Sequence, residues 1–230
     1  MHMSNSNKRV LIIGSSSKIA RLFIKDCPTD YEVYGTYRSA PSTLLPTDHQ
    51  FRADLGKPDE INNFLQQISQ LSFDAVLMFA ASYEPDPEIS DDYFDTFMKS
   101  LQLNSAGPVA IARGVNFAPN SKLFLFGDAG LNHPKKHFTA YSMAKFTVAE
   151  ATKLLAVELA PNTACICLQL GPTLRPSDKP KGNYYDKCLL KVEDPAAGLV
   201  HLLHFLIKEH NLNATGCTIN YDGGAYLRRL

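Results

Sequence analysis

The chain has 230 residues, of which 23 are Lys or Arg and 23 are Asp or Glu, so its formal net charge is zero. A hydrophobic fraction of 45% at this length predicts one globular core, and the neutral charge disfavours nucleic acid or an anionic membrane surface as the main partner. Five scattered cysteines, without an apolar run of about 18 residues, predict a cytoplasmic protein with neither a membrane span nor a metal site.

Short apolar runs alternate with stretches of helical periodicity. The apolar runs, each long enough for one strand, are residues 9–14, 32–36, 74–80, 122–127, 163–170 and 217–221, with a shorter run at 50–53. The helical stretches are residues 18–27, 59–71, 91–115, 138–160 and 195–209. Strands that are apolar on both faces suit a parallel sheet covered by helices on both sides. We therefore expect one doubly wound α/β domain with seven strands over residues 8–230, after a tag or disordered segment at 1–7.

Residues 172–191 contain proline, glycine, lysine, aspartate and two tyrosines without a clear period. An irregular stretch of this length inside a compact domain is often functional. We expect a loop that covers a substrate, and a merely variable surface loop is the alternative.

The turn after the first strand suggests a dinucleotide site. In a doubly wound sheet this turn holds a pyrophosphate at the N-terminus of the following helix. Gly14 can make the tight turn, Ser15 and Ser17 supply backbone N–H groups and small hydroxyls, and Lys18 and Ile19 begin the predicted helix.

Arg38 follows the second strand, where NAD-binding sheets tend to carry an acid. A cation at this place, with Lys18 and Ser15 nearby, favours the 2′-phosphate of NADP. An exposed surface arginine without such a role is the alternative.

Two further strand ends fit the same groove. Asp54 and Leu55 follow the third strand, and the Asp54 carboxylate can accept a hydrogen bond from an adenine amino group. Ala80, Ala81 and Ser82 end the fourth strand, where small residues let a cofactor lie flat against the backbone. Small residues and aspartate are also common at strand ends that bind nothing.

Tyr141 and Lys145 are four residues apart on the predicted helix 138–160, so their side chains share one face. A phenol with a pKa of about 10 is a poor acid at neutral pH. We expect the Lys145 ammonium to lower the pKa of Tyr141 and to hold the ribose hydroxyls of a nicotinamide nucleotide.

Together these features resemble the short-chain dehydrogenase/reductase family over roughly residues 8–230. Five motifs occur in the order and at the spacings of that family: Gly14-x-x-x-Lys18-Ile19-Ala20, Asn104 within 103–108, Tyr141-x-x-x-Lys145, Gly171-Pro172-Thr173, and Thr215-Gly216 followed by Asp222-Gly223-Gly224. Ala80 departs from the pattern, because the family usually has an asparagine there.

The resemblance implies a Rossmann-type fold, NAD(P)-dependent oxidoreductase activity and a homotetramer. Tyr141 would be the acid and Lys145 its partner. Asn104 would hold a water in the proton relay. Pro172 and Thr173 would contact the nicotinamide end of the cofactor.

Asp128 ends the fifth strand, where the family normally places its catalytic serine. A serine donates to a carbonyl oxygen that gains negative charge, whereas an aspartate would repel that oxygen. A carboxylate suits a substrate with N–H donors and a C=N bond that takes up a proton at nitrogen, as in reduced pterins.

Asp128 with Tyr141 and Lys145, and basic residues at Lys18 and Arg38, resemble the pteridine reductase and dihydromonapterin reductase branch, which serves pterin and folate metabolism. This resemblance implies NADPH-dependent reduction of dihydromonapterin to tetrahydromonapterin, with some reduction of dihydrofolate. Asp128, Tyr141 and Lys18 would then contact the pterin.

Two tyrosines complete the predicted substrate site. Tyr83 lies just beyond the fourth strand and can stack on a pterin ring, and Tyr184 can close over it from the irregular loop. Two other functions stay open. One is an NADP-dependent carbonyl reductase of the same family. The other is a catalytically silent NADP-binding sensor or scaffold, in which Asp128 only caps a turn near Gly130.

Overall fold

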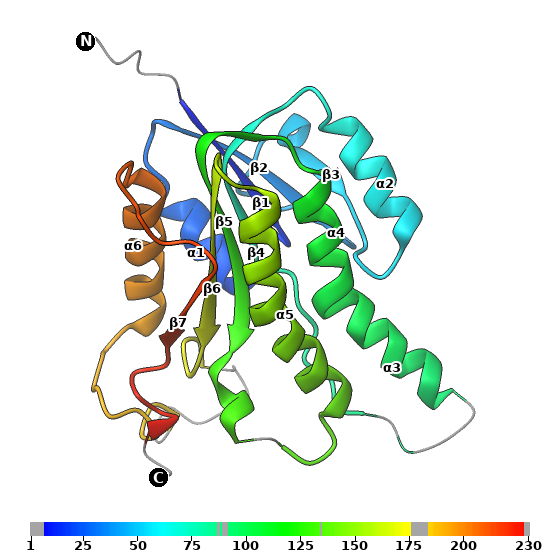
Figure 1. The fold of residues 1–230 in the computed structure, drawn as a ribbon, viewed down its shortest axis with the longest axis vertical. Coiled ribbons are helices and arrows are strands. Elements are labelled where there is room, and N and C mark those ends of the chain that lie inside the picture. Colours follow the sequence, from blue (N-terminus) through cyan, green and yellow to red (C-terminus); the bar gives the residue numbers. More distant parts are fainter. Residues whose placement is uncertain (1–6, 87, 89–91, 134, 176–183, 228–230) are drawn as a thin grey trace.

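A computed structural model describes residues 7–86, 88, 92–133, 135–175 and 184–227. It confirms the doubly wound α/β fold, with one parallel sheet in the order β3-β2-β1-β4-β5-β6-β7 (Figure 1). The strands are β1 Lys8–Ile13, β2 Tyr31–Tyr37, β3 Gln50–Arg52, β4 Phe73–Met78, β5 Phe117–Asp128, β6 Thr163–Leu170 and β7 Cys217–Tyr221. Most of the segment 1–7, and residues 176–183 of the predicted substrate loop, lie outside the described residues.

Helices cover both faces of the sheet. They are α1 Lys18–Lys25, α2 Pro58–Gln67, α3 Tyr93–Leu101, α4 Gly107–Gly114, α5 Thr139–Glu158 and α6 Pro195–Lys208. In Figure 1, α1 and α6 lie on one side of the sheet, and α2, α4 and α5 lie on the other. Each layer forms its own apolar cluster with one face of the strands, which explains why the central strands are apolar on both faces.

The predicted helix over 91–115 differs from the structure. A π-helical turn, Gln102–Ala106, separates α3 from α4. Single π turns inside helices often occur at functional sites, and this one contains Asn104. Hydrophobic periodicity does not reveal it, because one widened turn only shifts the apolar face.

The parallel arrangement brings the carboxyl ends of all seven strands to one edge of the sheet. Ligands of doubly wound proteins bind at this edge. Among the described residues, no helix is long and apolar enough to cross a membrane. Nor does any group of three or more His, Cys, Asp or Glu in that part of the chain have the arrangement of a metal site.

His204 lies in the layer formed by α1 and α6. Its ring stacks on Phe23 with 4.4 Å between the ring centres. Its side chain is 12% exposed, and the Asp26 carboxylate lies 3.7 Å from Nε2. Neither ring nitrogen has a hydrogen-bond partner among the described residues. Burial lowers the pKa of His204, an effect that the charge of Asp26 opposes and those of Lys208 and His201 reinforce.

We expect His204 to make the fold sensitive to acid. A histidine whose pKa is lowered in the folded state contributes its full stability above its unfolded pKa of about 6.5, and that stability is lost as the pH falls below it. His204→Phe should therefore reduce the loss of unfolding free energy between pH 7.5 and pH 5.5, measured by urea denaturation. His201→Gln, at a side chain that is 72% exposed, should keep the wild-type loss. Equal losses in wild type and His204→Phe would contradict this expectation.

Candidate functional site

The turn between β1 and α1 passes very close to the end of β4. Gly14 has φ +87°, and a Cβ at this position would lie 2.8 Å from the Ala80 Cα and backbone nitrogen. The Gly14 N–H donates to the Thr36 hydroxyl at 3.0 Å, and the Ala80 N–H donates to the Ile13 carbonyl at 2.8 Å. Only glycine fits here. The turn after β1 therefore packs directly against the backbone of Ala80, as the first turn of a dinucleotide site packs closely on its neighbours.

The two serines predicted to bind the cofactor have different environments. Ser15 is fully buried, and its hydroxyl donates to the Thr36 carbonyl at 2.9 Å. The sequence led us to expect that Ser15 helps to bind a 2′-phosphate. Its hydroxyl proton is instead used by the Thr36 carbonyl. Ser17 caps α1, since its hydroxyl oxygen accepts from the Ala20 N–H at 3.2 Å. Its own proton stays available to an anion at the helix N-terminus.

The other predicted cofactor residues near this turn differ in exposure. Lys18 is exposed at the start of α1, whereas Ile19 is half-buried against the cluster under α1 and α6. Arg38 is exposed after β2.

Asp54 and Leu55 follow β3. The Asp54 Oδ1 accepts from the Gly56 N–H at 2.9 Å, which fixes the carboxylate at the edge of the sheet. Leu55 is buried, and a Cβ on Gly107 would lie 2.7 Å from its carbonyl oxygen. The sequence did not single out Arg52, which carries no motif, yet its Nε donates to the Arg38 carbonyl at 3.4 Å.

Asn104 connects the π-helical turn to the end of β4. Its side chain is buried, its Oδ1 accepts from the Ser82 N–H at 2.9 Å, and its Nδ2 donates to the Ser100 carbonyl at 3.1 Å. Ala81, beside Ser82, is exposed. Asn104 thus holds the segment after β4 in place.

Three predicted catalytic residues converge at the end of β5. The Tyr141 hydroxyl donates to Asp128 Oδ2 at 3.0 Å. The Lys145 ammonium donates to the Phe126 carbonyl at 2.8 Å. Tyr141 is 9% exposed and Lys145 is 5% exposed. The i and i+4 spacing therefore places both side chains against the strand that ends in Asp128.

The expected effect of Lys145 on Tyr141 is wrong for this geometry. Burial raises the pKa of Tyr141 far above its usual range, and the charge and hydrogen bond of Asp128 raise it further. The Lys145 ammonium lies 6.0 Å from the centre of the Tyr141 ring and is directed at a backbone carbonyl. Tyr141 is thus held as a protonated phenol. Burial lowers the pKa of Lys145 to about 8, although the Asp128 charge opposes this shift.

The second oxygen of Asp128 is also engaged. Asp128 Oδ1 accepts from the Gly130 N–H at 2.6 Å and so caps the 3₁₀ turn Ala129–Asn132. The capping role and the contact with Tyr141 therefore coexist in one carboxylate. The cap fixes its orientation and leaves the other oxygen toward the phenol.

Aromatic side chains surround Tyr141. The Tyr83 ring stacks on Phe138 at 4.5 Å and meets Tyr141 edge-on at 4.8 Å, measured between ring centres. The Lys135 ammonium donates to the Tyr83 hydroxyl at 2.7 Å. The sequence did not single out Phe138, which begins the predicted helix 138–160 without a motif, or Lys135, which lies before it in a segment without strand or helix periodicity. Tyr83 therefore lies against Tyr141.

Tyr184 approaches the same region from the irregular loop. It is half-buried and packs edge-on against Tyr185 with 5.1 Å between ring centres. Burial raises the pKa of Tyr184 most, followed by the influence of Tyr185 and of the Asp128 charge. Tyr184 thus lies within electrostatic reach of Asp128.

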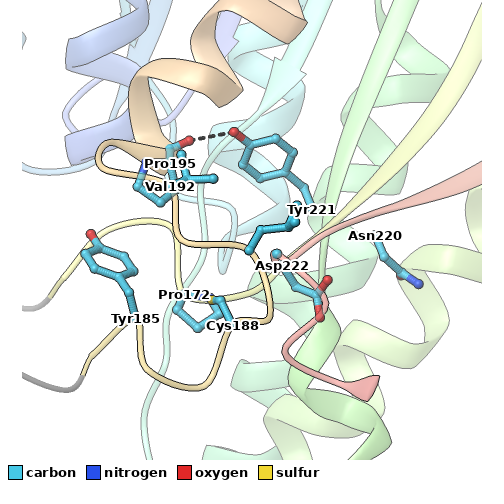
Figure 2. Close-up of a pocket in the computed structure, with 10 residues that line it drawn as sticks. Pro172, Tyr185, Cys188, Val192, Pro195, Asn220, Tyr221 and Asp222 are labelled. Carbon is cyan, nitrogen blue, oxygen red and sulfur yellow. Dashed lines mark hydrogen bonds between the residues drawn. The ribbon is translucent and has the colours of Figure 1, made fainter. Parts of the chain in front are cut away.

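A cavity of about 190 Å³ lies beside this region, between the irregular loop and the end of β7 (Figure 2). It is lined by Pro172, Tyr185, Cys188, Leu190, Val192, Pro195, Asn220, Tyr221, Asp222 and Gly223. Figure 2 shows the Tyr221 hydroxyl donating to the Pro195 carbonyl, a bond of 2.7 Å. Thr173, next to Pro172, is buried, and its hydroxyl donates to the Gly171 carbonyl at 3.2 Å.

The C-terminal segment is fastened to the site. Asp222 accepts from the N–H groups of Gly224 and Tyr226, both at 2.9 Å. A Cβ on Gly171 would lie 2.4 Å from the Asp222 Cβ, so β6 and the segment after β7 touch where both strands end. His133 Nε2 also lies 3.2 Å from the Tyr226 carbonyl, which links this segment to the chain after Asp128.

The residues at this edge of the sheet fit a nicotinamide dinucleotide. Gly14 packs tightly against Ala80, and Ser17 and the α1 N-terminus that follow it offer donors to a pyrophosphate. The ammonium of Lys145 has three donors, of which one is used by a described residue, the Phe126 carbonyl. A ribose diol suits the two remaining donors of a buried ammonium.

Gly14→Ala should destabilise the protein, because a Cβ would strain the positive φ and contact Ala80. We expect a loss of about 1–3 kcal/mol in unfolding free energy, measured by urea denaturation. Gly56→Ala is the control, since its Cβ would meet only the Asp54 carboxylate oxygen, at 3.3 Å. A loss at Gly14 no larger than that at Gly56 would show that the close approach of the two strand ends tolerates a side chain.

No protein-family model matches the sequence, and no curated protein matches it. Solved structures match the fold over 96% of this chain. A short-chain dehydrogenase family protein from Francisella tularensis has a TM-score of 0.79 at 21% identity, with 99% of its chain covered. A short-chain dehydrogenase from Burkholderia cenocepacia, solved with NADP, has 0.80 at 17% identity with 98% covered. A blue fluorescent protein from a metagenomic library, solved with NADPH, has 0.81 at 19% identity with 99% covered. The chain therefore has the Rossmann-type fold of the short-chain dehydrogenases/reductases.

Proposed function

We propose that this protein is an NADPH-dependent reductase whose substrate is a dihydropterin, with dihydromonapterin as the first candidate and dihydrofolate as the second. The observation that carries the proposal is the hydrogen bond from the Tyr141 hydroxyl to Asp128 Oδ2 at 3.0 Å. It joins a proton donor and a carboxylate at the edge of the sheet where ligands of this fold bind.

Tyr141 rests as a phenol rather than as a phenolate. Its raised pKa keeps the phenol protonated at neutral pH, so the donor is loaded before the substrate arrives. Oxidation of an alcohol would need a phenolate base, and burial beside Asp128 opposes that form. The resting form is therefore the one from which reduction starts, and proton release requires the pKa of Tyr141 to fall when cofactor and substrate bind.

Asp128 supports a nitrogen-containing substrate. Its carboxylate would repel a ketone oxygen that gains negative charge during hydride transfer. The same carboxylate can accept hydrogen bonds from ring N–H and amino groups, and its orientation is fixed by the Gly130 N–H. Tyr141, which it holds, would then donate its proton to the pterin ring nitrogen, directly or through a water beside Asn104.

The cofactor, when bound, would supply the hydride. In this chain, Lys145 would hold the nicotinamide ribose, and the Gly14 turn with Ser17 would hold the pyrophosphate. Arg38 and Lys18 are exposed at the adenosine end, where cations favour a 2′-phosphate. The NADP and NADPH in two structures of similar fold support this choice.

The oligomer that we propose is a homotetramer in the cytoplasm. Large apolar side chains of α5 are exposed in the single chain: Met143, Phe146, Leu154 and Val157. Such a surface is typical of an interface, and association of copies through α5 would cover it. The free cysteines suit a reducing compartment.

Turnover tests the reaction. With NADPH and dihydromonapterin we expect loss of the reduced nicotinamide absorbance, slowed at least about 100-fold in Tyr141→Phe, which removes the general acid. Tyr34→Phe is the matched control, because its hydroxyl bonds Glu32 away from the site.

The Asp128→Ser variant separates the candidates. It should cripple pterin turnover, whereas a carbonyl reductase would keep or gain activity on ketones. NADPH binding without turnover on any pterin or ketone, unchanged by Tyr141→Phe, would instead establish a silent sensor or scaffold. In such a protein Asp128 would only cap the turn through the Gly130 N–H.

The pH dependence tests Lys145. Because its pKa is lowered to about 8, the ammonium is charged below that pH and neutral above it. We expect kcat/KM for NADPH to fall above about pH 8, since kcat/KM reports groups of the free enzyme. Lys145→Arg, whose guanidinium stays charged, should be slower but flat over the same range. A wild-type profile that is flat to pH 10 would refute the role of Lys145.

A further inference from the structure

We propose that Arg52 is a second ligand of the cofactor 2′-phosphate, beside Arg38. The proposal rests on the proposed function, because it concerns the same NADPH. Arg52 is the last residue of β3 and pairs in register with Tyr37, the residue before Arg38. Its Nε donates to the Arg38 carbonyl at 3.4 Å. The two guanidinium-bearing residues are thus neighbours at the edge of the sheet where ligands bind.

The charges around Arg52 leave an excess of positive charge. Arg52 Nη2 lies 3.6 Å from Glu60 Oε1, and the same oxygen accepts from Lys57 at 3.1 Å. One carboxylate therefore serves two cations, and the structure shows no ion pair for Arg38 among its described residues. Asp54 Oδ1 is turned to the Gly56 N–H. A phosphate dianion would compensate the unbalanced charge.

Glu60 also fixes where these groups lie. Its Oε2 accepts from the Asp54 N–H at 3.0 Å, so one side chain links the residue predicted to face adenine with Arg52. The Lys57 hydrogen bond, more than any other contact, lowers the pKa of Glu60. The carboxylate is thus charged at neutral pH and holds Arg52 at the adenosine end of the groove.

Arg52 has donors to spare. A guanidinium carries five N–H donors in a planar fork that matches two phosphate oxygens. The described contacts use its Nε and bring one Nη group near Glu60. The side chain is 63% exposed. It can therefore turn its fork to a phosphate beside Arg38 without breaking a buried contact.

Binding of adenosine nucleotides tests this role without any turnover. The probes are adenosine 2′,5′-bisphosphate and adenosine 5′-monophosphate, which differ in the 2′-phosphate, and calorimetry suits a chain without tryptophan. We expect Arg52→Ala to weaken binding of the bisphosphate about tenfold and binding of the monophosphate less than about twofold. This is the effect expected for the loss of one charged hydrogen-bonding group. Arg52→Lys should recover part of the loss, because it keeps the charge but not the fork.

Lys57→Ala is the matched control. It removes one positive charge from the same Glu60, and we expect both nucleotides to bind within about twofold of wild type because a screened surface charge contributes little. If Lys57→Ala and Arg52→Ala weaken nucleotide binding equally, Arg52 acts only through its positive charge, and the proposal is overturned. An Arg52→Ala variant that loses both nucleotides equally would also overturn it, since Arg52 would then only hold the loop.

Arg38→Ala distinguishes this proposal from the proposed function. If Arg38→Ala loses the preference for the bisphosphate and Arg52→Ala keeps it, the role of Arg52 is refuted while NADPH selection stands. If wild type prefers the bisphosphate and neither variant changes that preference, Arg52 has no role while NADPH selection stands through other residues. If wild type binds the two nucleotides equally, the assignment of NADPH fails and that of Arg52 fails with it.

Discussion

The site depends on how closely β1 and β4 approach where both strands end. The Ala80 N–H continues the ladder to the Ile13 carbonyl, and Gly14 then turns with a positive φ directly against the Ala80 backbone. A side chain at position 14 would push the two strands apart. This contact brings the α1 N-terminus and the segment 80–83 to the same groove, so the phosphate-binding turn and Tyr83 both depend on it.

Asp128 ties the other half of the groove together. One of its oxygens caps the turn after β5 and the other accepts from Tyr141 on α5. The strand, the turn and the helix are thus joined by one carboxylate. The same carboxylate raises the pKa of the phenol that it holds, so the residue that builds the site also keeps its proton donor loaded.

Much of this arrangement is predictable from the sequence. Apolar runs at 9–14, 74–80 and 163–170 predict strands because a buried parallel strand is apolar on both faces. Tyr141 and Lys145 are predictable as neighbours because helical spacing places them on one face. The π-helical turn at Asn104 is not, because it alters neither composition nor the general period.

What each side chain contacts is harder to predict than where it lies. Spacing places Lys145 near Tyr141, but its ammonium is directed at the Phe126 carbonyl, which no pattern shows. Ser15 sits in the expected turn, yet its hydroxyl is bound to a neighbouring strand. Arg52 ends a strand of three residues, so its closeness to Arg38 follows from sheet register rather than from a motif.

The attachment of the C-terminal segment affects when the site can form during synthesis. Asp222 packs on Gly171, and the Tyr226 carbonyl accepts from Nε2 of His133, a partner 93 residues earlier that lies just after Asp128. Contacts between such distant positions form late, because the chain between them must first be ordered. A ribosome that has released β1 to β6 has therefore made every proposed catalytic side chain, but not the residues that close the wall beside them. A nascent chain has no complete site until Asp222 and Tyr226 have emerged.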